Sequence, residues 1–289
     1  MSKSHLTSWS MYITLVFLTL SITTQAKKNN KDEFFAEGHK LFRLEKAAWY
    51  GSDYLTTNHP YLLKKIGGYI TYINEDQTVT HIFYGDQDSS EVLLTTRFDS
   101  IAGPHPLEVD SVHRDALPRE LRLIQARSIA VRRFFNNPKK FYSFYRGTSN
   151  NFVVLEGEKG KIRVYILTAS KSNEYLLIGN DYCLHFNRKI KLKKEERFHK
   201  SLLKFPFRSD DPENEISQTM HNHKVGDLIS PTDICTLLLY KNHLSWSLHT
   251  VYGKNHVSIF NLNTENLLIL KKKAWKRIGR DIEERGLEK

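Results

Sequence analysis

The sequence predicts an α+β protein, and three observations support this fold class. Hydrophobic residues make up 40% of the 289-residue chain and charged residues 26%, which is close to an ordinary globular composition. Several short runs of β-branched and aromatic residues, bounded by Gly, Asn or Asp, alternate with segments of helical periodicity. Cys183 and Cys235 are too few for a disulfide scaffold or for a zinc finger of paired Cys-x-x-Cys. They could pair in an oxidising compartment, but we favour buried free thiols.

Residues 1–26 have the features of a secretory signal peptide. Lys3 precedes an apolar run at residues 11–22, and Thr24 and Ala26 place small residues at −3 and −1 of a cut after Ala26. The run is shorter than the ~20 residues that span a bilayer, and a retained N-terminal anchor is the alternative. No later stretch approaches that length. We therefore predict a secreted or periplasmic protein with no transmembrane span after cleavage.

Residues 27–138 predict an N-terminal α+β region. Apolar residues recur at helical spacing over residues 33–50, and three strand-like runs follow at residues 68–73, 78–84 and 92–98. A second helix is predicted at residues 117–135 and ends before Asn136-Asn137-Pro138. Its predicted buried face is formed by Leu121, Ile124, Ser128, Val131 and Phe135.

Residues 139–270 predict a second α+β region. Its strand-like runs lie at residues 152–156, 162–168, 175–178 and 182–186. A helix at residues 232–240 precedes two further strand-like runs at residues 246–252 and 257–262. Residues 271–289 form a basic tail, which we interpret as a solvated terminal helix.

One short constellation in this second region is suited to metal binding. His221 and His223 are separated by one residue, so on a strand both imidazoles point to the same face. Asp233 supplies a third ligand if residues 224–229 fold back toward that face. Three protein ligands with one open position are the arrangement of catalytic zinc sites. The segment from Ser230 to Asp233 also has the composition of a helix start.

The pair His221-x-His223 followed by Ser230-x-x-Asp233 resembles the motif of the JAMM (MPN-type) metalloproteases. The resemblance implies a curved mixed β-sheet flanked by helices over residues 139–270, with zinc held by His221, His223 and Asp233. It implies that Ser230 helps to position the reacting oxygen. It also implies an upstream glutamate as general acid/base, for which we choose Glu158. The intervening loop is one residue shorter than in the family's usual pattern.

Two functions follow from these features. The first is a zinc-dependent hydrolase of peptide or isopeptide bonds acting on a peptide or protein substrate. The alternative is a non-catalytic extracellular or periplasmic protein whose basic surface binds an anionic partner, since the chain has a formal net charge of +11. Nucleic acid is the least expected partner because the basic residues are dispersed. We interpret His243, His249 and His256 as structural histidines, and we predict no oligomeric state.

Overall fold

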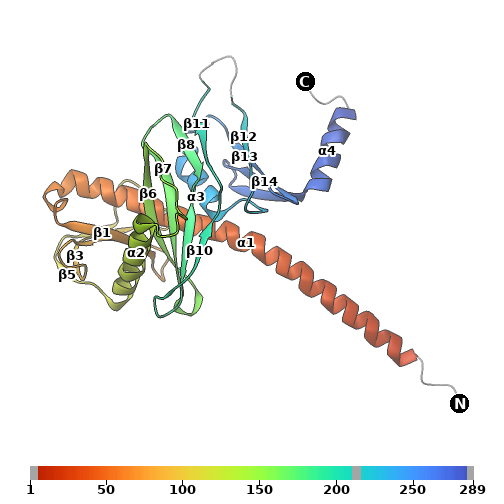
Figure 1. Cartoon of the computed structure of the whole chain (residues 1–289), viewed down its shortest axis with the longest axis horizontal. Coiled ribbons are helices and arrows are strands. Elements are labelled where there is room, and N and C mark those ends of the chain that lie inside the picture. Colours follow the sequence, from red (N-terminus) through yellow and green to blue (C-terminus); the bar gives the residue numbers. More distant parts are fainter. Residues whose placement is uncertain (1–5, 210–215, 285–289) are drawn as a thin grey trace.

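The computed structural model describes residues 6–209 and 216–284, with side chains described for residues 32–209, 216–281 and 284. It confirms the predicted α+β class: an N-terminal helix and antiparallel sheets precede a C-terminal mixed sheet with helices. Figure 1 shows a long first helix that extends from the body of the molecule. The helices are α1 (Leu6–Asn58), α2 (Pro118–Asn136), α3 (Pro231–Tyr240) and α4 (Lys272–Glu284), with short 3-10 turns η1 (Pro60–Leu62), η2 (Glu158–Gly160) and η3 (Lys241–His243).

The first sheet is the predicted antiparallel meander. Strands β1 (Ile66–Ile73), β2 (Val79–Gly85) and β3 (Glu91–Phe98) lie side by side in chain order. The short strands β4 (Glu108–Asp110) and β5 (Arg114–Asp115) both pair with β3. All seven residues of β2 are buried, because α1 covers one side of this sheet and apolar residues of α2 and β6 pack against the other.

The second sheet lies at the centre of the molecule. Its antiparallel strands are β6 (Thr148–Glu156), β7 (Ile162–Ser170), β9 (Tyr182–Phe186) and β10 (Leu192–Arg197), in the order β10-β9-β7-β6. Strand β8 (Tyr175–Gly179) pairs instead with β11 (Leu202–Pro206). Strands β10 and β11 lie in segments where no strand was predicted.

The third sheet carries the predicted metal ligands. Strand β12 (Gln218–Asn222) pairs in parallel with β13 (Leu248–Tyr252), and β14 (His256–Asn261) and β15 (Asn266–Lys271) continue the sheet in antiparallel fashion. Parallel neighbours need a crossover connection, and α3 provides it. Strand β15 and helix α4 occupy the end of the second region and the predicted basic tail.

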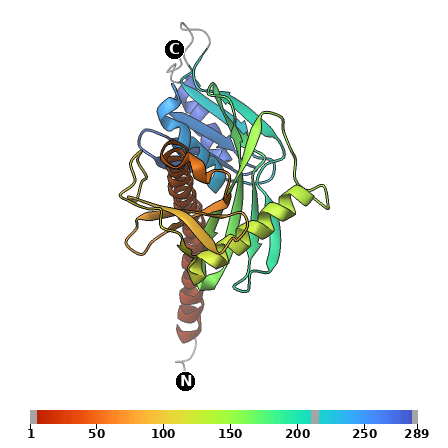
Figure 2. The ribbon, with the colours of Figure 1, turned by 90° about the vertical axis from the view of Figure 1, so that its left-hand side faces the viewer.

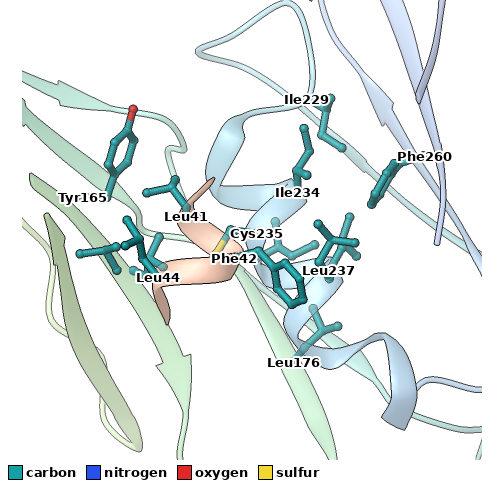
Figure 3. Close-up of a cluster of buried hydrophobic side chains, with 14 of the residues drawn as sticks. Leu41, Phe42, Leu44, Tyr165, Leu176, Ile229, Ile234, Cys235, Leu237 and Phe260 are labelled. Carbon is teal, nitrogen blue, oxygen red and sulfur yellow. The ribbon is translucent and has the colours of Figure 1, made fainter. Parts of the chain in front are cut away.

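Helices α1 and α3 pack against each other in the main core. Phe42 of α1 lies beside Leu237 of α3, and Leu41 and Leu44 lie on the side of α1 that faces Tyr165 (Figure 3). Gly38 permits this approach, because a Cβ at that position would lie 2.7 Å from the Cβ of Ile234. The same core includes side chains of β2, β3, β6 and β7, so α1 links the two predicted regions, and the boundary at residue 138 stays a prediction. Cys183 and Cys235 are buried free thiols.

Helix α2 buries a different face from the predicted one. It lies against β1, β6 and β7 (Figure 2). Its buried apolar residues are Leu123, Ile124, Ala126, Ala130 and Phe134, whereas Leu121 is 41% and Phe135 61% exposed. The predicted face was therefore wrong: the observed buried face is rotated about the helix axis by about one residue. The small alanine side chains allow the helix to pack close to the sheet. Leu121 and Phe135, which were predicted to be buried, lie on the exposed side.

Within the described part of the chain, no helix is both long enough and apolar enough to cross a membrane. The predicted signal peptide falls partly on residues 1–5, outside the described residues. The rest of it lies in α1, where only the backbone is described before residue 32. Cleavage after Ala26 therefore stays a prediction.

Candidate metal centre

Strand β12 brings its alternate side chains into the protein interior. Thr219, His221 and His223 are buried, and Met220 is 52% exposed. The alternation follows from the two-residue period of a strand. It continues one residue past the end of β12, because the His223 amide still donates to the Tyr252 carbonyl at 2.9 Å. The two histidines therefore share one face of the sheet.

The start of α3 brings Asp233 to the same place. Ser230 is the N-cap and Pro231 occupies the first turn. The Asp233 amide donates to the Ser230 hydroxyl at 3.1 Å, and the Ser230 amide donates to Oδ2 of Asp233 at 3.0 Å. This reciprocal capping box satisfies two amides that a helix start otherwise leaves free. It also fixes the Asp233 carboxylate at the helix N-terminus.

A third histidine completes the cluster. His199, in the connection between β10 and β11, places its Nε2 2.8 Å from Nε2 of His223 and 3.0 Å from Oδ1 of Asp233. The Nε2 atoms of His223 and His221 lie 3.1 and 3.9 Å from Oδ2 of Asp233. One potential ligand atom from each of these four buried residues lies within 4.8 Å of every other. Such a cluster could hold a metal ion.

The outer nitrogens of two imidazoles are engaged by neighbouring groups. Nδ1 of His223 donates to the Leu228 carbonyl at 2.7 Å. Nδ1 of His221 lies 2.8 Å from Nε2 of His249, whose own Nδ1 lies 2.8 Å from the Thr219 hydroxyl. If each Nδ1 in this relay donates, Nε2 of both His221 and His223 presents a lone pair to the cluster. Fixing ring orientation and tautomer in this way is typical of metal-binding histidines.

Several buried nitrogen atoms of the cluster are better satisfied by a metal ion than by hydrogen bonds to one another. Nε2 of His221 is buried without a hydrogen-bond partner among the described residues, as is Nδ1 of His199. The Nε2 atoms of His199 and His223 lie 2.8 Å apart, so without a metal this contact is a hydrogen bond only if one of them carries a proton. Burying unpaired polar atoms costs free energy. A cation among these nitrogen atoms would remove that cost.

The protonation states of His221 and Asp233 also suit metal ligation. Burial, partly offset by Asp233, lowers the pKa of His221 to about 4, which keeps its imidazole neutral at pH 7. Burial alone would raise the pKa of Asp233, but His199 and His223 outweigh it and hold the pKa well below its usual value. The cluster therefore combines an ionised carboxylate with nitrogen donors.

Asp181 stands behind His199. Its Oδ2 lies 3.9 Å from Nδ1 of His199, and its Oδ1 accepts from the Thr168 amide at 3.0 Å. Burial raises the pKa of Asp181 to about 7. Burial would lower the pKa of His199, but the nearby Asp233 and Asp181 carboxylates raise it overall. Nδ1 of His199 therefore lies near a carboxylate but makes no hydrogen bond among the described residues, unlike Nδ1 of His221 and of His223.

A cleft of about 760 Å³ reaches the cluster at His223 and Ser230. Helix α1 borders it with Phe34 and Glu37, and the 223–231 loop forms another border. Oε1 of Glu37 accepts from the Tyr165 hydroxyl, and its Oε2 pairs with Arg163 at 2.5 Å. The cleft thus combines apolar rings with charged groups beside the cluster.

The structure brings together some of the predicted site residues and not others. His221, His223 and Asp233 share the cluster, and Ser230 lies at the start of α3 with its hydroxyl also 2.9 Å from that of Thr232. Glu158 is an exposed residue of η2 and is not among the residues that line this cleft. Its acid/base role stays a prediction.

Two histidines of the site had no signal in the sequence. His199 lies in a lysine-rich stretch, and His249 was interpreted as structural. Pairing of β13 with β12 brings His249 beside β12, and the connection between β10 and β11 brings His199 to the cluster. Comparisons with protein-family models, with curated proteins and with solved structures found no match to this chain.

Proposed function

We propose that the chain is a zinc-dependent hydrolase of peptide or isopeptide bonds, acting after export to a secreted or periplasmic location. The observation that carries this proposal is the buried cluster of three imidazoles and one carboxylate beside a cleft. Nitrogen donors combined with one carboxylate are typical of zinc. Bound there, zinc would polarise the scissile carbonyl and bring the pKa of a water near neutrality.

In this proposal His221, His223 and Asp233 are the permanent ligands. The two imidazoles have engaged outer nitrogens, and the capping box holds the carboxylate. His199 is held less firmly, because its Nδ1 makes no hydrogen bond among the described residues. We assign it as a fourth donor that yields its place when substrate enters, since catalytic zinc sites keep one position open.

The cleft would hold the substrate chain next to Ser230. The Ser230 hydroxyl already accepts from the Asp233 amide, so its proton can be donated to a substrate carbonyl oxygen instead of to Thr232. The cleft volume of about 760 Å³ is typical of ligand-binding clefts. A cleft of this size can enclose several side chains of a peptide. Apolar rings and paired charges along it suit a peptide better than a highly charged small molecule.

Glu37 is the carboxylate that we propose for proton transfer in place of Glu158. It lines the same cleft as His223 and Ser230 and is only 6% exposed. Burial raises its pKa although the Arg163 guanidinium opposes that effect. A carboxyl group with a raised pKa can accept a proton from water and deliver it to a leaving amine.

The test is hydrolysis of casein peptides and of a lysine ε-amide-linked peptide by the full chain with zinc, read by mass spectrometry. We expect cleavage that a chelator abolishes and added zinc restores. Glu37→Gln should lower the rate by about 10²–10⁴-fold while zinc content stays unchanged. Glu158→Gln is the matched control and should keep full activity. A zinc-loaded chain that cleaves neither substrate contradicts the proposal.

A structural metal site is the second candidate, and His199 is the observation that favours it. Four protein ligands and no open position are typical of structural zinc. The His199→Ala variant separates the two functions. In the hydrolase the variant keeps zinc, held by three ligands, and in a structural site it loses thermal stability together with zinc.

A further inference from the structure

Helix α4 lies outside the protein core. It follows β15 directly and projects from the third sheet, on the opposite side of the molecule from α2 (Figure 1). The Trp275 ring meets the Tyr252 ring at 6.5 Å, and the Lys272 amide donates to the Asn255 carbonyl at 2.8 Å. From residue 276 to residue 281 every residue is exposed, including Ile278 at 40%.

The helix has an apolar side and a basic side. At 3.6 residues per turn, Ala274, Trp275 and Ile278 project to one side. The opposite side is cationic and consists of Lys273, Lys276, Arg277 and Arg280. A helix with such a polar face and a Trp-containing apolar face is suited to lie in the interface of a membrane.

The charges of α4 run against the helix dipole. Lysines occupy residues 271–273 at its N-terminus, its first turn contains no acid, and Asp281 lies near its C-terminus. The positive end of a helix favours anions and disfavours cations. Isolated helices shorter than ~12–15 residues are marginal in water even with favourable charges. Anionic groups within reach of its cations would stabilise this helix.

We propose that α4 binds the surface of an anionic lipid bilayer, with Trp275 and Ile278 at the boundary between headgroups and acyl chains. The cations of the helix would pair with lipid phosphates. A bilayer uses both sides of α4, whereas a nucleic acid would leave the apolar side in water. The apolar run at residues 11–22 independently predicts that the chain crosses or stays at a membrane. This inference does not depend on the hydrolase proposal.

The test is sedimentation of the full chain with vesicles of 70% phosphatidylcholine and 30% phosphatidylserine, and with pure phosphatidylcholine. We expect binding to the anionic vesicles only, weakened at high salt because exposed charges are screened. The triple variant Lys276→Glu/Arg277→Glu/Arg280→Glu should bind at least ~100-fold more weakly, since each cation near an anionic surface contributes about fivefold. The matched control is Lys189→Glu/Lys191→Glu/Lys193→Glu, with the same charge change on exposed residues around the β9–β10 hairpin.

Two single variants test the apolar side and the helix itself. Ile278→Gln keeps the charge and should weaken vesicle binding several-fold. Gly279→Ala should strengthen it, by up to about fivefold, because alanine favours helix by about 1 kcal/mol over glycine and a Cβ there meets nothing within 4 Å. Absent vesicle binding overturns the proposal, as does equal loss in the control triple variant. Binding to duplex DNA that exceeds vesicle binding at the same salt also overturns it.

Discussion

Two helices of this protein begin in the same way but differ in what surrounds the first turn. Helix α2 begins with Pro118 and α3 with Pro231, and two residues later each has a buried acid, Glu120 or Asp233. Each carboxylate accepts the amide of its own N-cap residue, at 2.8 Å for Glu120 and 3.0 Å for Asp233. The local sequence therefore makes two nearly equivalent helix starts.

The two carboxylates differ in the side chains that other parts of the fold bring to them. Glu120 accepts two hydrogen bonds from the Arg114 guanidinium, at 2.8 and 2.9 Å, and one from the Tyr72 hydroxyl at 2.8 Å. All of these partners are donors, so the protein satisfies the carboxylate by itself. Asp233 instead faces imidazoles, whose nitrogens can also serve as metal ligands. A buried acid surrounded by imidazoles is a candidate metal ligand, and one surrounded by guanidinium and hydroxyl donors is structural.

The largest expected effect is the gain in stability when zinc binds the cluster at the start of α3. Free zinc at ~1,000 times its dissociation constant should stabilise the full chain by about 4 kcal/mol, and a chelator should remove that gain. The His221→Ala/His223→Ala variant should show no zinc-dependent shift of Tm by calorimetry. The matched control is His59→Ala/His113→Ala, a half-buried and an exposed histidine outside the cluster, and it should keep the shift. A zinc response of the first variant equal to wild type would place the metal elsewhere.

The next largest effect is expected at the start of α2, where protein donors alone satisfy the Glu120 carboxylate. Glu120→Gln should lower the free energy of unfolding by about 2–3 kcal/mol, because it leaves a half-buried guanidinium without its anion. Burial would raise the pKa of Glu120, but Arg114, the Leu117 amide and Tyr72 outweigh it and lower the pKa. The stabilisation is therefore complete above the unfolded pKa of ~4.3 and is lost as pH falls through the folded pKa. Urea titrations at pH 7 and pH 3 measure both effects, and zinc binding should not change.

A third effect concerns the relay behind His221. His249→Ala or Thr219→Val should weaken zinc binding about 10–100-fold, the usual effect of losing a group that orients a ligand. Competition with a chromophoric chelator measures the affinity. His256→Ala is the control, because His256 pairs with Asp227 at 2.8 Å in the same region without touching the cluster. Equal losses in both variants would show that the relay is not specific.

The smallest effect separates the two roles of Ser230. Ser230→Ala should cost about 1 kcal/mol of stability by loss of the cap, whereas Ser230→Gly should cost only a few tenths. Zinc affinity should stay within a few-fold in both variants. If Ser230 also acts on substrate, both variants lose hydrolytic activity equally despite their different stabilities. Thermal unfolding and the peptide assay, run on the same preparations, give the two readouts.

The sequence predicts those parts of the site that are local along the chain. The alternation at His221 and His223 and the helix start at Ser230 depend on a few neighbouring residues, and the structure has both features. His199 and His249 could not be found in this way, because pairing of β11 with β8 and of β13 with β12 determines their positions.

The fold shows the same limit. The predicted strands of the first two sheets are rich in β-branched and aromatic residues, but β10 has the sequence Leu-Lys-Lys-Glu-Glu-Arg. Such a strand forms at a sheet edge because β9 offers its hydrogen-bonding groups, not because its residues favour strand. The face of α2 was missed because small alanines, rather than the larger Leu121 and Phe135, determine how closely a helix packs.

The central claim is that the cluster at the start of α3 binds a metal ion, and elemental analysis tests it most directly. The full chain, purified without chelator, incubated with excess zinc and desalted, should contain one zinc per chain, and the His221→Ala/His223→Ala variant should contain none. A wild-type chain that is metal-free after this treatment, or a variant that retains the full stoichiometry, would contradict the claim.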